Sequence, residues 1–172
     1  MGKNQVKIMD AYDITLATRK DEEQVLSLLK EVAGWLKDKE IDQWRFLADG
    51  GEDEEIKQAI LSKSTYVVKK SESFVATFTL YETQSDWDQH IWGQKNDGAV
   101  YLHRLALTRE AIGSALGKTV LLWLEEHVKE MGKTILRLDC VENNSKLNYF
   151  YLNNGYENVG VKDEHSKYQK NL

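Results

Sequence analysis

The sequence predicts an α/β fold, and three observations lead to that prediction. The chain has 172 residues, 41% of them apolar, which is enough for one domain with a substantial core. Between Ala99 and Gly160 the apolar pattern changes between strand and helix periods, in the order strand, glycine-bearing turn, helix, strand, helix. The first of these strands also carries an irregularity that predicts a bend.

The segment before Ala99 predicts two helices followed by two strands. Asp21 stands three residues after Thr18, a pattern typical of a helix N-terminus. Apolar residues then recur at helical spacing, at Val25, Leu28, Leu29, Val32 and Leu36. The other elements expected here are a helix over 53–61, strands over 65–69 and 74–81, and a long loop or irregular hairpin over 85–98.

The strand predicted over 99–108 has a break in its alternation. Its apolar residues recur at a spacing of two, then three, then two, at Val100, Leu102, Leu105 and Leu107. One face can hold all four only if the strand inserts an extra residue, so a β-bulge is expected near Arg104. A bulge leaves backbone N–H and C=O groups unpaired, and such groups are free to bind a ligand.

The elements after this strand are marked by their end signals. Gly132 fits the position just after a helix, and Asn154-Gly155 marks the end of another. The elements expected are a helix over 118–131, a strand over 134–141, a helix capped by Asn144 or Ser145, and a closing hairpin over 156–161 and 165–169.

The composition argues against several classes of function. The formal net charge is −5 and Lys and Arg form no separate cluster, so nucleic acid is not expected as a partner. The longest apolar run, 119–124, is too short to span a membrane, and the first residues lack a signal-peptide core, so a cytoplasmic protein is expected. Cys140 is the only cysteine, which excludes an intrachain disulfide and a multi-cysteine zinc site. Its apolar strand predicts a buried, unreactive thiol.

The turn from Ile112 to Lys118 joins the bulged strand to a helix and is rich in small residues. Backbone N–H groups at a helix N-terminus bind anions, so this turn is suited to a phosphate, although a tight turn without a ligand explains the same residues. The segment 113–119 is also one residue short of the phosphate-binding loop of nucleotide triphosphatases. That alternative is disfavoured because His103 and Arg104 occupy the preceding strand, which should then be almost entirely apolar.

Together, the strand, the turn and the following tyrosine-bearing helix resemble the GNAT superfamily of acyl-CoA-dependent N-acetyltransferases. The family's pyrophosphate signature, Gln/Arg-x-x-Gly-x-Gly/Ala, aligns with Ile112, Ala115 and Gly117, of which the last matches. A second family pattern, Asn followed seven residues later by Tyr and then by Gly-Phe, corresponds to Asn144, Tyr151, Gly155 and Tyr156. The resemblance is clear over 99–160 and weaker over 1–98.

The resemblance implies a single N-acetyltransferase-like domain over 1–172, with a mixed, mostly antiparallel sheet splayed at the bulged strand and flanked by helices. It implies acetyl-CoA as the acyl donor and a primary amine of a small molecule or peptide as the acceptor; a homodimer is left open. No metal is expected because His90 and His127 lack metal-ligand spacing, and the lack of an evident nucleophile other than Cys140 predicts direct transfer in a ternary complex. The implied donor-binding residues are Leu105, Leu107, Ile112, Gly113, Ser114, Ala115, Leu116, Gly117, Lys118 and Asn144. A non-catalytic acyl-CoA sensor of the same fold is the alternative.

Two residues are predicted to carry the chemistry. The resemblance places the Tyr151 hydroxyl near the thioester sulfur, where a phenol can protonate the leaving thiolate, although a core tyrosine explains the same residue. His103 is the candidate base, since an imidazole titrates near neutral pH and the strand resembles the histidine-bearing strand of arylalkylamine N-acetyltransferases. A histidine satisfied within the sheet is the alternative, and Glu142 is the reserve base.

Overall fold

The computed structural model describes residues 6–8, 12–40 and 50–172. These residues form two compact units. One unit consists of the residues before 80 together with 104–119, and the other consists of 80–103 and 120–172.

The first unit is built on four antiparallel strands. These are β1 (Val6–Ile8), β2 (Tyr12–Leu16), β3 (Thr65–Lys70) and β4 (Ser73–Tyr81), hydrogen-bonded in that order. The last two agree with the predicted strands, whereas β1 and β2 were not expected. Both are short, with at most five residues each, so their alternation is a weak signal in the sequence.

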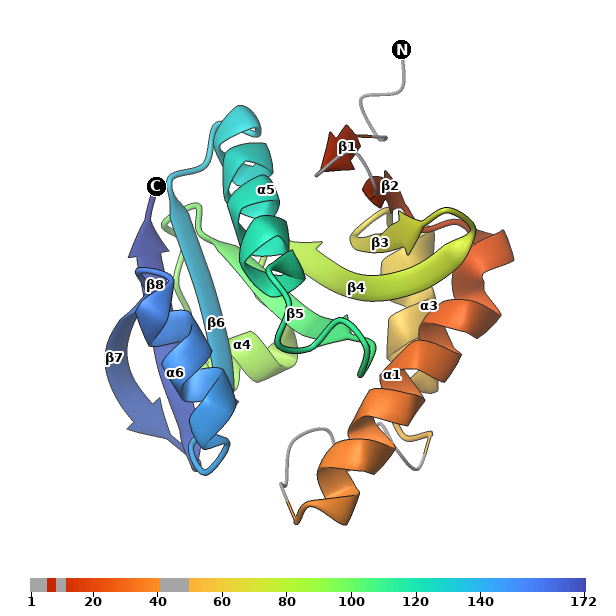
Figure 1. The fold of residues 1–172 in the computed structure, drawn as a ribbon. Helices are drawn as coiled ribbons and strands as arrows, with labels where there is room; N and C mark the ends of the chain where they lie inside the picture. The colour runs from red at the N-terminus through yellow and green to blue at the C-terminus, as the bar shows by residue number, and fades with distance from the viewer. Residues whose placement is uncertain (1–5, 9–11, 41–49) are drawn as a thin grey trace. The chain divides into compact units, whose positions relative to one another are not determined.

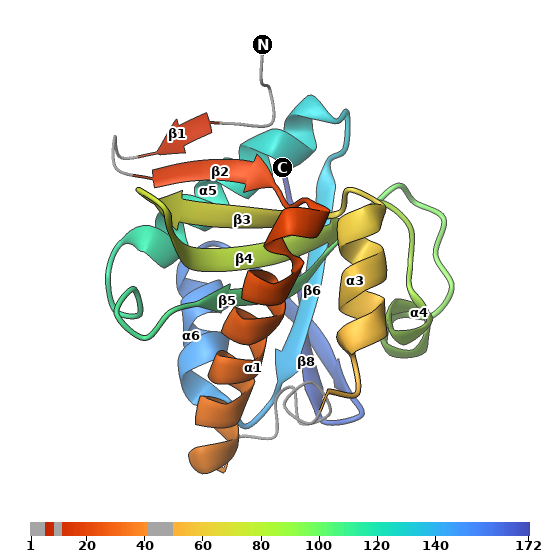
Figure 2. The same cartoon turned by 90° about the vertical axis from the view of Figure 1, so that its right-hand side faces the viewer.

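Two helices pack on one face of these strands (Figure 2). Helix α1 (Glu22–Asp38) follows a 3₁₀ turn over Arg19–Asp21, and α3 is Asp53–Leu61 as predicted. The predicted start is confirmed, because the Thr18 N–H donates to Asp21 Oδ2 at 2.8 Å. Their apolar faces meet the sheet in one core, which contains Val25, Leu28, Leu29, Val32, Ile56, Ile60 and Val67.

The second unit has the strand order β5-β6-β8-β7. Strands β5 (Val100–Leu107) and β6 (Ile135–Val141) are parallel, while β6 and β7 (Glu157–Lys162) both run antiparallel to β8 (His165–Asn171). The predicted closing hairpin is therefore confirmed as β7 and β8. Helix α6 (Ser145–Asn153) lies in front of β8 in Figure 1.

The segment expected as a long loop over 85–98 instead contains helix α4 (Asp86–Trp92), so that prediction was wrong. A capping box starts this helix: the Asp88 N–H donates to Ser85 Oγ, and the Ser85 N–H donates to Asp88 Oδ2. Ile91 and Trp92 bury its inner face. The two apolar side chains outweigh the polar character of the other residues, which had suggested a loop.

The predicted end signals of the remaining helices are confirmed. Helix α5 is Leu116–Glu130 and is followed by Gly132 with a φ of +79°, the left-handed conformation that glycine adopts most readily. The Asn144 side chain caps α6 by accepting from the Leu147 N–H at 3.3 Å.

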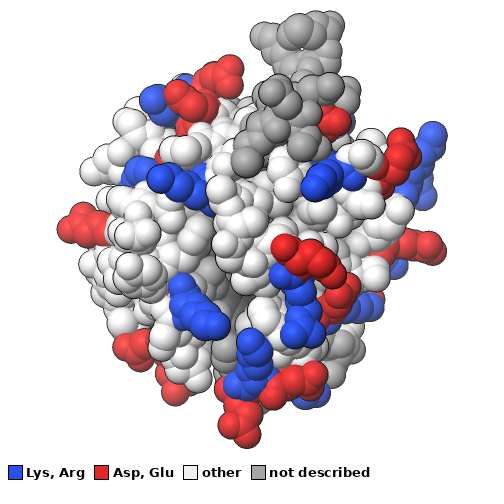
Figure 3. All heavy atoms as spheres, viewed as in Figure 1, with Lys and Arg blue, Asp and Glu red and all other residues white. Residues whose placement is uncertain are grey.

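Basic and acidic side chains are interspersed on the face shown in Figure 3, in keeping with the modest net charge. Within the described ranges, no helix is both long enough and apolar enough to cross a membrane.

Candidate active site

The turn before α5 presents backbone donors at the N-terminal end of a 15-residue helix. Gly113 turns the chain with a φ of +85°. The N–H groups of Ala111, Ile112 and Ser114 donate to carbonyls of residues 108–111, and the Leu116 N–H donates to Ser114 Oγ at 3.2 Å. In the described part of the chain, four more N–H groups here have no hydrogen-bond partner: those of Gly113, Ala115, Gly117 and Lys118. Free donors at the positive end of a helix fit the pyrophosphate of an acyl-CoA.

The two departures from the family signature leave this turn accessible. Ile112 stands where the signature has a polar residue, and its side chain is 45% exposed. Ala115 stands where the signature has glycine and is also exposed. Both side chains are therefore on the surface, and neither is part of the core beneath the turn.

Strand β5 changes conformation at the predicted bulge position. Arg104 has a φ of +53°, which is uncommon for a residue with a Cβ, and its guanidinium lies 3.4 Å from Glu52 and 3.8 Å from Glu55. Leu105 and Leu107 follow it and are half-buried. Their predicted part in binding the acyl donor stays a prediction.

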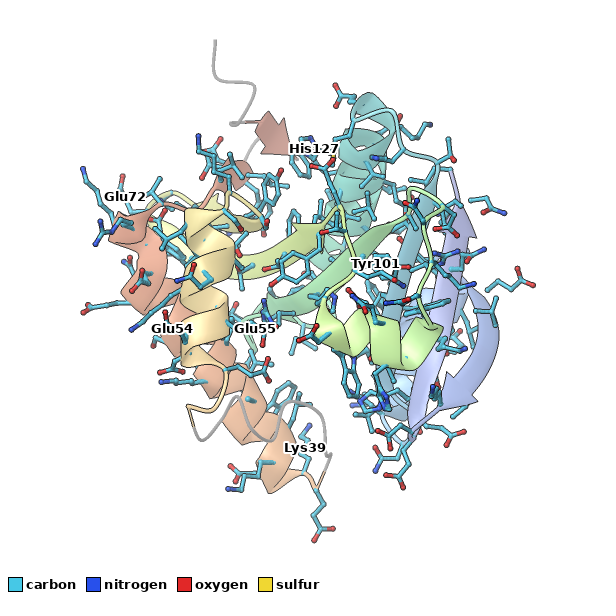
Figure 4. All side chains as sticks on the ribbon, turned by 180° about the vertical axis from the view of Figure 1, so that it is seen from behind. Lys39, Glu54, Glu55, Glu72, Tyr101 and His127 are labelled. Atoms are coloured by element: carbon cyan, nitrogen blue, oxygen red, sulfur yellow. The ribbon has the colours of Figure 1, made fainter. Side chains whose placement is uncertain are left out.

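The parallel pairing of β5 with β6 is confined to two residue pairs, Val100 with Leu136 and Tyr101 with Arg137. Figure 4 shows Tyr101 on β5, next to α4. Beyond Tyr101, the register gives His103 no partner on β6. Pairing with β6 therefore ends two residues before the residue predicted to act as the base.

His103 is held by a buried carboxylate that sequence reasoning missed. Its Nε2 lies 2.9 Å from Asp88 Oδ1 and 3.0 Å from Asp88 Oδ2. The Asp88 side chain is 1% exposed and the His103 side chain 13% exposed, so only the histidine is open to solvent. The Tyr81 ring lies 5.1 Å from the imidazole, between ring centroids. The one sequence signal for Asp88 was its place three residues after Ser85, as in a capping box.

A second carboxyl group lies on the same side of the second unit as Asp88. Asp139, on β6, accepts a hydrogen bond of 3.0 Å from the indole N–H of Trp87, on α4. The Trp87 ring also meets His165 edge-on, with the centroids 4.8 Å apart. Burial raises the pKa of the Asp139 carboxyl, opposed by the charge of His103 and by the indole hydrogen bond. Asp139 was not predicted as a site residue, because its partner Trp87 lies 52 positions away in the sequence.

Tyr151 packs on the other face of the β6–β8 pair. Side chains alternate along a strand, so Tyr168 of β8 faces away from His165 and Lys167. The Tyr151 ring lies 5.8 Å from that of Tyr168, whereas Trp87 contacts His165. Tyr151 is 4% exposed, and burial, with smaller effects from Cys140 and Asp139, raises the pKa of its phenol well above the ordinary value. Among the described residues its hydroxyl has no hydrogen-bond partner. Because its pKa is raised, the hydroxyl is protonated and can still donate a hydrogen bond.

The remaining predicted residues have structural tasks or open surroundings. The side-chain oxygen of Asn144 caps α6, and Asn144 is 6% exposed. Glu142, the reserve base, is exposed at the end of β6, and its backbone N–H donates to the Glu164 carbonyl. Cys140 is buried and unpaired as expected, and burial raises the pKa of its thiol to about 12. No group of three metal-ligating side chains occurs in the described part of the chain.

Comparison with known proteins shows the family to which this chain belongs. The family model described as "Acetyltransferase (GNAT) family" matches residues 26–156. An uncharacterized N-acetyltransferase of Bacillus subtilis (strain 168), YesJ, is 36% identical over 155 residues, covering 90% of this chain and 86% of that protein. The chain therefore belongs to the GNAT family of acetyltransferases, and the prediction of an N-acetyltransferase is confirmed.

Solved structures agree with this assignment. A GNAT-family acetyltransferase from Listeria monocytogenes 4b F2365 has a TM-score of 0.82 and 28% identity, covering 98% of this chain and all of that one (100%). The PaiA N-acetyltransferase from Thermoplasma acidophilum, solved in complex with coenzyme A, has a TM-score of 0.71 at 19% identity and covers 94% of this chain and 99% of that one. The predicted α/β fold with a mixed, mostly antiparallel sheet is confirmed. The protein is an acetyltransferase whose family uses acetyl-CoA, and the nucleotide triphosphatase alternative is set aside.

Proposed function

We propose that this enzyme transfers an acetyl group from acetyl-CoA to a primary amine of a small molecule or peptide, in one step within a ternary complex. The observation that carries the proposal is His103, a partly exposed imidazole that lies two residues beyond the last residue of β5 paired with β6 and rests on a buried carboxylate. An amine acceptor needs such a base, because a free alkyl amine has a pKa of about 10.4 and is mostly protonated at neutral pH.

The donor is held, in this proposal, by backbone groups. The free N–H groups of the turn before α5 bind the pyrophosphate, helped by the helix dipole. The backbone of Leu105 and Leu107 pairs with the pantetheine amides, and the Asn144 side chain supplies a further contact to the donor. We propose that residues 1–172 act as one catalytic domain.

The transfer exchanges one bond for another. The amine nitrogen forms a bond to the thioester carbonyl carbon, and the bond from that carbon to sulfur breaks. His103 accepts the proton that the amine nitrogen loses, and the Tyr151 hydroxyl donates a proton to the departing thiolate. Because these two side chains lie on opposite faces of the second unit, the thioester must lie between them, where β5 is no longer paired with β6. A one-step transfer is supported by the state of Cys140, the only thiol in the sequence, because a buried cysteine with a raised pKa is a poor nucleophile.

The test has a binding part and a turnover part. Calorimetry should show saturable binding of acetyl-CoA and none of Mg-ATP. Thiol release from acetyl-CoA is then followed with ethanolamine, putrescine, lysine and tyramine, and initial rates at varied concentrations of both substrates should give intersecting lines. Parallel lines would contradict direct transfer, and thiol release that no amine accelerates would contradict the amine acceptor.

His103→Gln tests the base, with His90→Gln as the matched control. His90 also lies beside an aspartate, with Nε2 3.2 Å from Asp163, but its side chain is 50% exposed. We expect His103→Gln to lower kcat/KM by about 10² to 10⁴ and to remove the low-pH limb of its profile. His90→Gln should leave both unchanged. A wild-type profile in His103→Gln would rule out His103 as the base.

A further inference from the structure

The hydrogen bonds of Asp88 determine which nitrogen of His103 carries the hydrogen. Both atoms facing Nε2 are carboxylate oxygens, at 2.9 and 3.0 Å, and an ionised carboxylate only accepts hydrogen bonds. Nε2 must therefore donate, and in the neutral imidazole Nδ1 carries the lone pair. Across the described ranges, Nδ1 of His103 has no hydrogen-bond partner. The neutral side chain thus keeps one basic nitrogen unoccupied.

The carboxylate itself is fixed from its own helix. Asp88 Oδ2 accepts from the Ser85 N–H at 3.0 Å, and the Asp88 N–H donates to Ser85 Oγ at 3.2 Å. This reciprocal cap holds Asp88 within the first turn of α4, where the helix N-terminus favours negative charge. With 1% exposure, the carboxylate has almost no contact with solvent other than through its partners.

We propose that Asp88 is a positioning residue for catalysis: it holds the His103 imidazole in the tautomer whose Nδ1 accepts the proton of the acceptor amine. This inference rests on the proposed function of His103 as the base. After proton transfer, both nitrogens of His103 carry hydrogen, and the Asp88 carboxylate lies against the positive charge that has formed. The pair then returns the proton to solvent through the exposed part of the imidazole.

In the described part of the chain, groups from three elements act on the His103 side chain. Asp88 contacts it from α4 and Tyr81 from β4, while the Asp139 carboxyl interacts with it electrostatically from β6. His165, on β8, acts on Asp139 in the same way. Only Asp88 is hydrogen-bonded to the imidazole among these, so a change at Asp88 alters the tautomer without removing the other groups.

Asp88→Asn is the decisive variant, because an amide can keep the helix cap while reversing the bond to His103. The amide oxygen still accepts from the Ser85 N–H, which leaves the amide NH₂ group facing Nε2. Nε2 must then accept, and the neutral imidazole carries its hydrogen on Nδ1, so the basic lone pair is occupied. Ser85→Ala is the matched control, since it removes only the hydroxyl that accepts from the Asp88 N–H.

The tautomer is read directly by ¹⁵N NMR of histidine-labelled protein without any substrate. We expect hydrogen on Nε2 of neutral His103 in the wild type and in Ser85→Ala, and hydrogen on Nδ1 in Asp88→Asn. In thiol-release assays with the best amine of the panel above, Asp88→Asn should lower kcat/KM by about 10² or more.

The outcomes separate this inference from the proposed function. An Nε2–H tautomer in Asp88→Asn, or wild-type kinetics in that variant while His103→Gln is impaired, overturns the role of Asp88. Full turnover in His103→Gln overturns the proposed base instead, and the NMR result still reports whether Asp88 sets the tautomer. An equal loss of activity in Ser85→Ala and Asp88→Asn, with His103 unchanged in its tautomer, assigns Asp88 to the helix cap alone.

Discussion

Replacing Tyr151 with Phe removes a single oxygen from a ring that is 4% exposed on α6. The aromatic contacts of this ring, at 5.7 Å to Tyr156 and 5.8 Å to Tyr168, are kept by Phe. Its hydroxyl makes no hydrogen bond with any described residue, so the substitution breaks none. We therefore expect the free energy of unfolding to change by less than about 0.5 kcal/mol.

The expected effect on turnover is much larger. If the Tyr151 hydroxyl protonates the leaving thiolate, its loss lowers kcat by about 10² to 10⁴, which corresponds to about 3 to 5 kcal/mol of transition-state stabilisation. The calorimetric affinity for acetyl-CoA should stay unchanged. Thiol release at saturating acetyl-CoA measures the first quantity, and urea unfolding measures stability.

Tyr156→Phe is the matched control, because that hydroxyl is used structurally. It donates a 2.8 Å hydrogen bond to the buried Glu125, which also contacts Lys170 at 3.0 Å. Losing a hydrogen bond to a charged group costs about 1.5 to 3 kcal/mol of stability. The kcat of the variant, measured where the variant stays folded, should not change. The assignment of Tyr151 as the acid is refuted if Tyr151→Phe turns over at the wild-type rate, or if it loses stability as Tyr156→Phe does.

Three further outcomes are expected. Gly113→Ala places a Cβ at a φ of +85° and should cost about 1 to 2 kcal/mol in urea unfolding and weaken acetyl-CoA binding in calorimetry; unchanged stability and affinity would contradict the role of the turn. Burial raises the pKa of Cys140 to about 12, so above about pH 9 the unfolded chain releases a thiol proton that the folded chain keeps. The free energy of unfolding should therefore fall as the pH rises, by at most about 1.4 kcal/mol per pH unit from this thiol. Cys140→Ala should flatten this slope between about pH 9 and 11. Arg137 donates hydrogen bonds to both carboxylate oxygens of Asp97, at 2.9 and 2.6 Å, and lowers the pKa of that carboxyl. The contribution of this ion pair to stability is therefore present above about pH 4 and is lost as the pH falls further. Because the Asp97 side chain is 39% exposed and solvent screens the pair, Asp97→Asn should cost only about 0.5 to 1 kcal/mol at pH 7 and reduce the acid sensitivity of unfolding; an unchanged acid transition would count against this ion pair.

Most helices and strands could be predicted because their signals are local. The helix start at Thr18, the glycine after α5 and the Asn144 cap all depend on residues within a few positions of one another. The bulge was predicted in the same way, from spacing alone, and Arg104 has the positive φ that such an irregularity accommodates. The segment 85–98 was misread because its capping box is short and its two apolar anchors follow a polar stretch.

The sequence by itself determined the fold class, the acetyltransferase family and the turn that offers free N–H groups before α5. Only the tertiary structure decided that Asp88 supports His103 at 2.9 Å and that Trp87 donates to Asp139 across 52 positions of sequence. Helix caps and apolar periods follow from the bonds that a short segment makes with itself, so they are visible in the order of residues. The partner of a buried polar group depends on how separate elements pack, and a histidine has the same appearance in a sequence whether its neighbour is a carboxylate, a carbonyl or water.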